Sequence, residues 1–288
     1  MHTVAHAESA SSHSKVTATT RVAVAGATGY TGQELLRLLA RHPQVTLRAA
    51  MSSGTTASAR PLPALARVWN GSITPLSPET LAREAEYVFL ALPDSAAADL
   101  APQLVDAGVR VVDLSGAFRL RNQAERRRWY PDTKTMPPGV AYGLTEHERD
   151  GVRGARLVAN PGCYPTATLL ALAPLVDAGL VLPDTDIIVD AKSGVSGAGK
   201  TPSERTHFSE CHGSMSAYGV FNHRHGAEIE QGAGRSVTFT PHLVPLDRGL
   251  LSTIYVRVPP GTTEEALGDL YTRAYADSAF VRLTGSLL

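Results

Sequence analysis

The stretch that decides the fold is Arg21-Val22-Ala23-Val24-Ala25-Gly26-Ala27-Thr28-Gly29-Tyr30-Thr31-Gly32. It predicts a short apolar strand that runs directly into a glycine turn, and the leucines that follow fall on one helical face. In this order of strand, turn and helix, the amides at the helix start can cradle a dinucleotide pyrophosphate. The glycines recur at every third residue, whereas the usual fingerprint has its first two glycines two residues apart. The alternative, that this turn is a glycine-rich connection that binds no ligand, therefore stays open.

Short strands and helices continue to alternate after this turn. We expect strands at Val45–Ala50, Tyr87–Leu92 and Val109–Leu114, with a helix over Ala96–Asp106. This order is typical of a parallel sheet with helices on both faces, in which ligands lie at the carboxyl ends of the strands. The sequence therefore predicts an α/β chain with a Rossmann-like dinucleotide-binding domain.

The second strand lacks the acidic residue that would hold the ribose hydroxyls of NAD. No Asp or Glu occurs between Glu34 and Glu79, although several arginines do. Such a site admits a 2′-phosphate, so NADP is favoured over NAD; the alternative is that these arginines are solvated surface charges. The predicted cofactor-binding residues in this half are Gly26, Thr28, Gly29, Tyr30, Thr31, Gly32, Ser52, Ser53 and Pro93.

The segment Asn160-Pro161-Gly162-Cys163-Tyr164-Pro165-Thr166 brings a cysteine to the start of an apolar helix. The dipole and the unpaired amides of a helix start favour a thiolate, so we expect the pKa of Cys163 to lie below its ordinary value of about 8.5. The alternative is a small buried cysteine that fills a gap between strand and helix.

The second half has longer strands, which suggests an α+β catalytic and dimerisation domain. One strand is expected at Asp186–Ala191, two long antiparallel strands at Ser236–Val244 and Leu250–Val258, and a helix at Glu264–Ala276. We therefore divide the chain into a disordered tail over residues 1–20, a dinucleotide-binding domain over 21–160 and a catalytic domain over 161–288.

Two further groups of side chains have possible chemical roles. His223 and His225 stand two residues apart with Glu228 just beyond, which supplies a proton donor and a carboxylate to orient it. A pair of surface histidines is the alternative, and no nearby residues complete a metal site. Arg119 follows the strand Val109–Leu114, at the edge of the sheet where ligands bind, and can hold a phosphate or carboxylate there with two hydrogen bonds. The alternative is an ordinary surface charge.

Composition excludes several classes of protein. The chain has 288 residues, of which 43% are hydrophobic and 19% charged, and its formal net charge of +0 indicates neither a nucleic-acid-binding nor a membrane surface. We found no apolar run long enough to span a membrane and no targeting leader. Two cysteines make no disulfide framework, so a reducing, cytoplasmic location is expected.

Taken together, five segments resemble the N-acetyl-gamma-glutamyl-phosphate reductases, which belong with the aspartate-semialdehyde dehydrogenases. They are Gly26–Gly32, Ser115–Arg119, Asn160–Thr166, Lys192–Lys200 and His223–Ile229. The resemblance runs from about Arg21 to the last residue, and its cysteine and His-Arg-His segments are the most specific.

The resemblance implies reduction of an acyl phosphate by NADPH through a thioester on Cys163, with His223 as acid/base. It also implies that Arg119 binds the substrate anion, and that Glu228 orients a histidine. Further substrate contacts are expected from Asn160, His225 and Glu228, and nicotinamide contacts from Ser193 and Gly194. The implied product is N-acetyl-glutamate semialdehyde, in arginine synthesis, made by a homo-oligomer.

The chain also departs from the family pattern. It has Asp94-Ser95 in place of His-Gly and Gly226-Ala227 in place of Thr-Pro. It ends at Leu288, where relatives continue with a segment that returns to the first domain, so we expect a shortened member of the family. Two other functions stay open: reduction of aspartyl phosphate, which the His-Arg-His segment argues against, and a catalytically silent relative that acts as a binding module.

Overall fold

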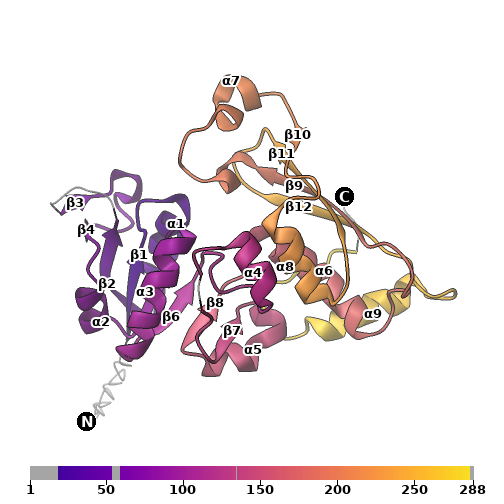
Figure 1. Cartoon of the computed structure of the whole chain (residues 1–288), viewed down its shortest axis with the longest axis horizontal. Helices are drawn as coiled ribbons and strands as arrows, with labels where there is room; N and C mark the ends of the chain where they lie inside the picture. The colour runs from indigo at the N-terminus through magenta and orange to yellow at the C-terminus, as the bar shows by residue number, and fades with distance from the viewer. Residues whose placement is uncertain (1–18, 54–58, 134, 286–288) are drawn as a thin grey trace, which may run out of the picture.

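The structure is a computed structural model that describes residues 19–53, 59–133 and 135–285. Most of the expected tail, residues 1–18, lies outside the described residues. Figure 1 shows two lobes, one built on an eight-stranded sheet and the other on a four-stranded sheet. The α/β class and the Rossmann-like first half are confirmed.

The first sheet has the strand order β3-β4-β2-β1-β5-β6-β8-β7. All its neighbouring strands run parallel except β3 and β4, which are antiparallel. The apolar stretch at the start of the chain forms β1 at the middle of the sheet. The strands are β1 (Thr20–Ala25), β2 (Val45–Ser52), β3 (Arg60–Pro61), β4 (Ser72–Pro75), β5 (Tyr87–Leu90), β6 (Arg110–Asp113), β7 (Val140–Tyr142) and β8 (Leu157–Ala159).

Helices cover both faces of this sheet, as the alternating pattern predicted. On one face Leu36 of α1 packs into a cluster with Val24 and Ala50, and on the other Leu100 and Leu104 of α3 pack onto the strands. Burial of these side chains supplies the main stabilisation of the lobe. Its helical elements are α1 (Tyr30–Leu39), η1 (Pro63–Leu65), α2 (Pro78–Glu84), α3 (Asp94–Asp106), α4 (Gln123–Trp129) and α5 (Thr145–Gly154).

Two glycines in the first turn are required by close backbone contact. Gly26 has a φ of +88°, and a Cβ there would collide with the carbonyl oxygen of Ala91. A Cβ on Gly32 would collide with the carbonyl oxygen of Gly26. Helix α1 can therefore start directly against the turn, and its first amides remain at the carboxyl end of β1.

The second sheet has the strand order β10-β11-β9-β12. The expected long strands are β11 (Thr238–Val244) and β12 (Leu250–Tyr255), and they run antiparallel as predicted, with β9 (Ile188–Gly194) between them. The remaining elements are α6 (Cys163–Asp177), η2 (Val195–Ala198), η3 (Glu204–Thr206), α7 (Phe208–Cys211), β10 (Ser216–Ala217), α8 (Arg224–Ala233) and α9 (Glu264–Ala274).

Helices α6 and α8 cover one face of the second sheet. Leu172, Val189, Ile229 and Phe239 share a buried cluster between them and the strands. The expected boundary between residues 160 and 161 falls between β8 and α6, and the division into two domains stays a prediction. Within the described part of the chain, no helix is long and apolar enough to cross a membrane.

Candidate functional site

Cys163 is the first residue of α6, directly after the end of β8. The amide of Asn160 still bonds to the carbonyl of Asp113 in β6, and Gly162 then forms the N-cap of the helix. The apolar residues that follow bury the helix against the second sheet. The thiol is thus fixed where the carboxyl edge of the first sheet meets the second lobe.

A cavity of about 320 Å³ opens at this thiol. It brings together four residues that the sequence singled out separately, Cys163, Ser193, His223 and His225. Larger hollows of about 500 and 910 Å³ lie elsewhere on the second lobe, and neither is lined by Cys163 or either of these histidines. The residues that line the cavity around Cys163, rather than the volume of the cavity, identify it as the candidate site.

His223 is the N-cap of α8. Its Nδ1 accepts a hydrogen bond of 3.1 Å from the backbone amide of His225. In a neutral imidazole the other nitrogen then carries the proton, so His223 presents an Nε2–H donor. Burial, and to a smaller extent the charge of Arg224, lowers the pKa of His223 to about 4, so this neutral tautomer prevails near neutral pH.

His225 lies deeper in the site. Within the described part of the chain its Nδ1 has no hydrogen-bond partner, and a Cβ on Gly162 would lie 2.5 Å from its Nε2. Burial, with smaller effects of His223, Arg119 and Arg224, lowers the pKa of His225 to about 2. The His225 imidazole is therefore uncharged and packs against the turn that precedes Cys163.

The environment of Cys163 corrects one expectation. Cys163 is solvent-exposed, but desolvation by the protein atoms around the sulfur raises the pKa of the thiol, and the amides of Tyr164 and Cys163 itself, together with the charge of Arg119, offset only part of this effect. The helix start does act on the sulfur in the expected direction. The lowered pKa that the sequence predicted is nevertheless wrong, because the surrounding protein removes more hydration from a thiolate than the amides replace.

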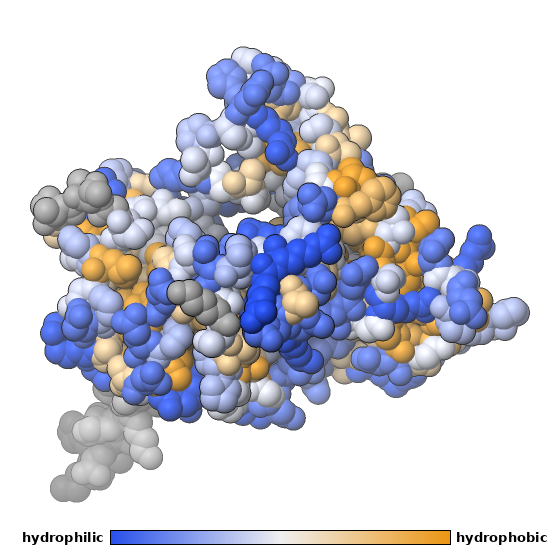
Figure 2. Space-filling view, in the orientation of Figure 1, coloured by the Kyte–Doolittle hydropathy of each residue, from blue (hydrophilic) through white to orange (hydrophobic). Residues whose placement is uncertain are grey.

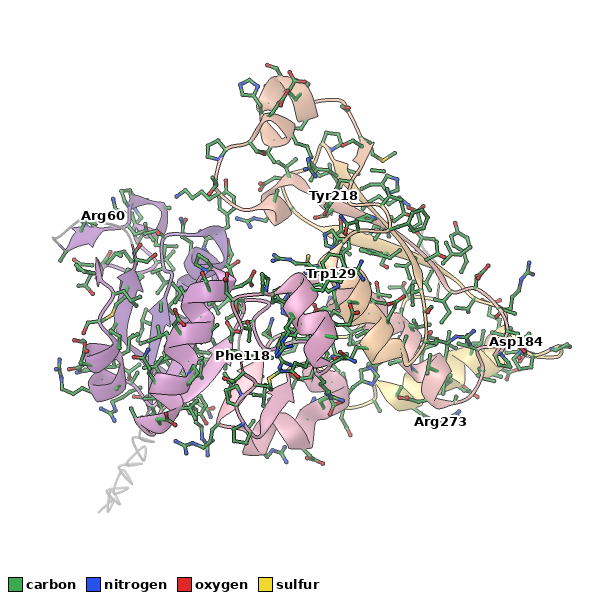
Figure 3. All side chains as sticks on the ribbon, viewed as in Figure 1. Arg60, Phe118, Trp129, Asp184, Tyr218 and Arg273 are labelled. Carbon is green, nitrogen blue, oxygen red and sulfur yellow. The ribbon has the colours of Figure 1, made fainter. Side chains whose placement is uncertain are left out.

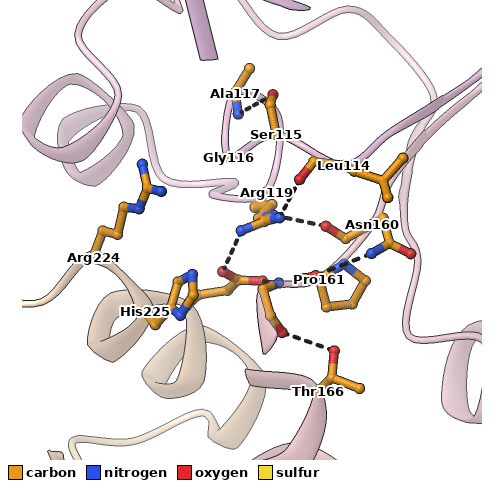
Figure 4. Close-up of polar contacts among 12 residues, drawn as sticks. Leu114, Ser115, Gly116, Ala117, Arg119, Asn160, Pro161, Thr166, Arg224 and His225 are labelled. Atoms are coloured by element: carbon orange, nitrogen blue, oxygen red, sulfur yellow. Dashed lines mark hydrogen bonds and ion pairs between the residues drawn. The ribbon is translucent and has the colours of Figure 1, made fainter. Parts of the chain in front are cut away.

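Arg119 and Glu228 form a buried ion pair, and neither lines the cavity. Figure 4 shows the Arg119 guanidinium beside Leu114 and Asn160. The guanidinium donates to the carbonyls of Asn160 and Leu114 at 2.7 and 2.8 Å, and its Nη1 lies 3.6 Å from Glu228. In this structure protein acceptors hold the guanidinium, and the expected binding of a substrate anion by Arg119 stays a prediction.

Glu228 contacts the nucleophile turn instead of a histidine. Its Oε1 accepts hydrogen bonds from the amide of Gly162 at 2.9 Å and from the hydroxyl of Tyr142 at 2.8 Å. Glu228 is 1% exposed, and burial raises its pKa while Arg119 and these donors oppose the shift. The expected orientation of a histidine by Glu228 is therefore wrong; the carboxylate orients the residue that precedes Cys163. The Asn160 side-chain amide donates to the carbonyl of Pro161 at 3.2 Å.

Asp94 links the first lobe to the histidine helix. One carboxylate oxygen accepts from the amide of Gly116 at 2.6 Å, and the other pairs with Arg224 at 2.9 Å. Arg224 lies between the two histidines in the sequence and lines the cavity. The departure from the family pattern at Asp94, noted in the sequence, thus provides an ion pair across the two lobes, next to Pro93.

The glycine turn has the features that a dinucleotide requires. The first amides of α1 have no acidic side chain in their turn, and no carboxylate follows β2. The hydroxyls of Thr28 and Ser52 are joined by a hydrogen bond of 3.1 Å at the end of β2. Ser53 follows and is exposed. Amides and hydroxyls are the donors that cofactor phosphates need, so these residues fit NADP.

Sequence reasoning missed several residues of the site. Tyr164, Tyr218 and Arg205 line the cavity, and the Arg205 guanidinium lies 5.2 Å from the centre of the Tyr218 ring. Figure 3 shows Tyr218 in the second lobe, between α7 and α8 in this view. Tyr164 was quoted only as part of the cysteine segment, and Tyr218 and Arg205 carry no spacing signal, so only the fold shows that the three meet at the thiol. Among the described residues, no three His, Cys, Asp or Glu side chains gather as metal ligands.

Two family models match the chain. Residues 21–155 match the NAD binding domain of semialdehyde dehydrogenase, and residues 163–287 match the semialdehyde dehydrogenase dimerisation domain. Solved structures share the fold at low identity. Aspartate semialdehyde dehydrogenase II from Vibrio cholerae has a TM-score of 0.65 at 18% identity, over 88% of this chain and 78% of that one. The Candida albicans enzyme, solved with NADP, has a TM-score of 0.65 at 17% identity, over 88% and 76%.

Relatives identified by sequence have higher identity to this chain than these solved structures. The N-acetyl-gamma-glutamyl-phosphate reductase of Brevibacillus brevis is 44% identical over 274 residues, which cover 91% of this chain and 79% of the relative. The enzyme of the same name from Syntrophobacter fumaroxidans is 46% identical over 273 residues, with the same coverage. The chain therefore belongs to the semialdehyde dehydrogenase family and, within it, to the N-acetyl-gamma-glutamyl-phosphate reductases.

Proposed function

We propose that this chain reduces N-acetyl-glutamyl 5-phosphate to N-acetyl-glutamate 5-semialdehyde with NADPH, as the name of its relatives implies. One observation carries the proposal: Cys163 and a neutral His223 line the same cavity at the carboxyl edge of the dinucleotide-binding sheet. A nucleophile, a proton donor and a dinucleotide turn are the parts that thioester-based reduction requires.

The first step is acyl transfer to Cys163. The sulfur attacks the acyl carbon, the bond from that carbon to the phosphate oxygen breaks, and a thioester forms. Because desolvation raises the pKa of the thiol, most of the sulfur is protonated near neutral pH. The thiol proton leaves with the departing phosphate, so the step balances without a separate base.

The second step is reduction of the thioester. When bound, NADPH supplies the hydride that the thioester carbon accepts. The Nε2–H of His223 donates a hydrogen bond to the substrate oxygen as negative charge develops; as that oxygen takes the proton, the ring recovers one from solvent, which is the proton that the reaction consumes. In the collapse of the hemithioacetal the bond between carbon and sulfur breaks, the hydroxyl proton passes to the sulfur to restore the thiol, and the aldehyde is released. The complete reaction consumes one acyl phosphate, one NADPH and one proton.

The substrate assignment has a direct test. The chain should oxidise NADPH when given N-acetyl-glutamyl phosphate and should do so slowly or not at all with aspartyl phosphate. Faster turnover of aspartyl phosphate would favour the related dehydrogenase reaction. Absence of turnover with both, in a protein that still binds NADPH, would favour a silent binding module.

Cys163 should be essential for turnover, and Cys163→Ser should lower it by at least about 10³-fold because covalent catalysis is lost. Alkylation by iodoacetamide, read by peptide mass analysis, reports the ionisation of the thiol. Since desolvation raises its pKa, the thiolate fraction should be small at neutral pH and should grow as the pH rises above the ordinary thiol value. A labelling rate that levels off below pH 8 would contradict the raised pKa.

His223→Asn separates the chemical role of the histidine from its structural role. Asparagine is a good N-cap, so α8 should keep its start, whereas the Nε2–H donor is lost. We expect turnover to fall by about 10²-fold or more with little change in melting temperature. His223→Ala, which loses both roles, is the matched control and should also lower the melting temperature. Near-normal turnover in His223→Asn would exclude His223 as the proton donor.

We also propose that two copies pair through the face of the second sheet that α6 and α8 leave uncovered. Ile188, Leu251 and Tyr255 are 41%, 62% and 57% exposed and alternate with residues that pack against the helices. Register places Ile188 opposite Tyr255 and Leu251 opposite Lys192 on neighbouring strands, so this face combines exposed apolar side chains with the ion pair of Lys192 and Asp190. Figure 2 shows hydrophobic side chains gathered on the second lobe. The match to a dimerisation domain supports this use of the face.

Leu251→Glu combined with Tyr255→Glu should convert the oligomer to a monomer, because charge would have to be buried at the interface. Size-exclusion chromatography with light scattering measures the mass of the particle. Phe208→Glu, on the exposed α7, is the matched control and should leave the mass unchanged. A wild-type protein that is monomeric at micromolar concentration would contradict the pairing.

A further inference from the structure

We propose that Lys200 binds the 2′-phosphate of the cofactor from the second lobe and so helps to set the preference for NADPH over NADH. The inference rests on the proposed use of NADPH. The sequence places Lys200 at the end of the loop that follows β9, far along the chain from the glycine turn. The structure brings its side chain to that turn.

The loop that carries Lys200 runs from the catalytic cavity to the first lobe. Ser193, Gly197 and Ala198 line the cavity with Cys163. Two residues beyond Ala198, the Nζ of Lys200 lies 3.4 Å from the backbone carbonyl of Thr28. A cofactor bound with its nicotinamide at the thiol and its adenosine at the glycine turn would therefore lie along this loop. Figure 2 shows the surface hollowed between the first lobe and the segment that carries α7.

The turn between β11 and β12 holds the loop in place. The amides of Val195 and Ser196 donate to the carbonyls of Leu246 and Asp247 at 2.8 and 3.1 Å, and the Ser196 hydroxyl donates to the Asp247 carbonyl at 2.6 Å. The amide of Gly194 bonds to the carbonyl of Gly249. The loop and the turn therefore form one hydrogen-bonded unit.

The same unit is anchored to α1 by a second cation. Arg248 pairs with Glu34 at 3.2 Å, and its guanidinium lies 6.0 Å from the centre of the Tyr30 ring. Tyr30 is the first residue of α1 and Glu34 is in its second turn. This anchor holds the second lobe against the start of α1, so that Lys200 meets the glycine turn in a defined position.

The charge of Lys200 is uncompensated in this structure. Across residues 19–53, 59–133 and 135–285, no carboxylate lies within ion-pair distance of its Nζ, and a 3.4 Å contact to a neutral carbonyl is weak. Arg248, by contrast, is already paired with Glu34 and Asp247. Lys200 is therefore the cation of this unit that is available to a cofactor anion.

The position of Thr28 favours the 2′-phosphate over the pyrophosphate. The Thr28 hydroxyl bonds to the hydroxyl of Ser52, at the end of β2 where the adenosine ribose of a dinucleotide lies. The pyrophosphate is held farther along the turn, at the amides that start α1. An ammonium at the Thr28 carbonyl is thus next to the ribose end, with Thr28 and Ser52 as neighbouring donors.

The test is cofactor affinity without substrate, measured by fluorescence titration of NADPH and NADH and by calorimetry of 2′,5′-ADP and 5′-ADP. In Lys200→Gln, NADPH and 2′,5′-ADP should bind at least about tenfold more weakly, because a charge-assisted contact is lost. NADH and 5′-ADP, which lack the 2′-phosphate, should change by less than about twofold. Lys200→Arg should retain most of the preference for NADPH.

Lys192→Gln is the matched control, because Lys192 lies in β9 before the same loop but is paired with Asp190; it should leave all four affinities unchanged. Equal weakening of NADPH and NADH in Lys200→Gln would place Lys200 at the pyrophosphate and overturn the assignment. Unchanged affinities would show that it does not contact the cofactor. A wild-type chain that shows the Lys200-dependent preference but no turnover would leave this inference standing and remove the proposed function.

Discussion

The carboxylate of Glu228 is buried between the two lobes, and the arrangement of the site depends on how it is satisfied. Its donors are the amide of Gly162 and the hydroxyl of Tyr142, and Arg119 supplies the opposite charge. A buried carboxylate without such partners would cost several kcal/mol. The buried charge is therefore stabilised only when the turn before Cys163 adopts the conformation that places the Gly162 amide against Glu228.

Helix α8 carries Glu228 and begins directly after the proton donor, His223. Its N-cap is His223, and Glu228 lies just over one turn farther along the same helix. Gln231, another residue of the helix, donates to the carbonyl of Arg119 and accepts from the amide of Arg121. One rigid element therefore positions the thiol through Glu228 and the imidazole through its own start. A shift of α8 would displace both reacting groups together.

The sequence predicted the parts of this protein that local patterns encode. Strand, turn and helix around Gly26, the helix that starts at Cys163 and the parallel first sheet follow from hydrophobic periodicity and glycine positions. Pairing across the lobes could not be predicted this way, because Arg119 and Glu228 look like separate surface charges until the fold buries them together. The direction of the Cys163 pKa was missed for the same reason: the helix start is visible in the sequence, whereas the protein atoms that desolvate the sulfur come together only in the fold. Asp94 was noticed only as a departure from a family pattern, without its partner Arg224.

Hydrogen exchange at the Gly162 amide, measured by NMR, tests most directly whether Glu228 holds the nucleophile turn. In the wild-type chain this amide should exchange slowly, since it is buried and donates to Glu228 at 2.9 Å. In Glu228→Ala it should exchange at least about tenfold faster, relative to the amide of Val189 in β9, which reports on global unfolding. The same relative rate in both proteins would show that the turn is held by something else and would contradict the account.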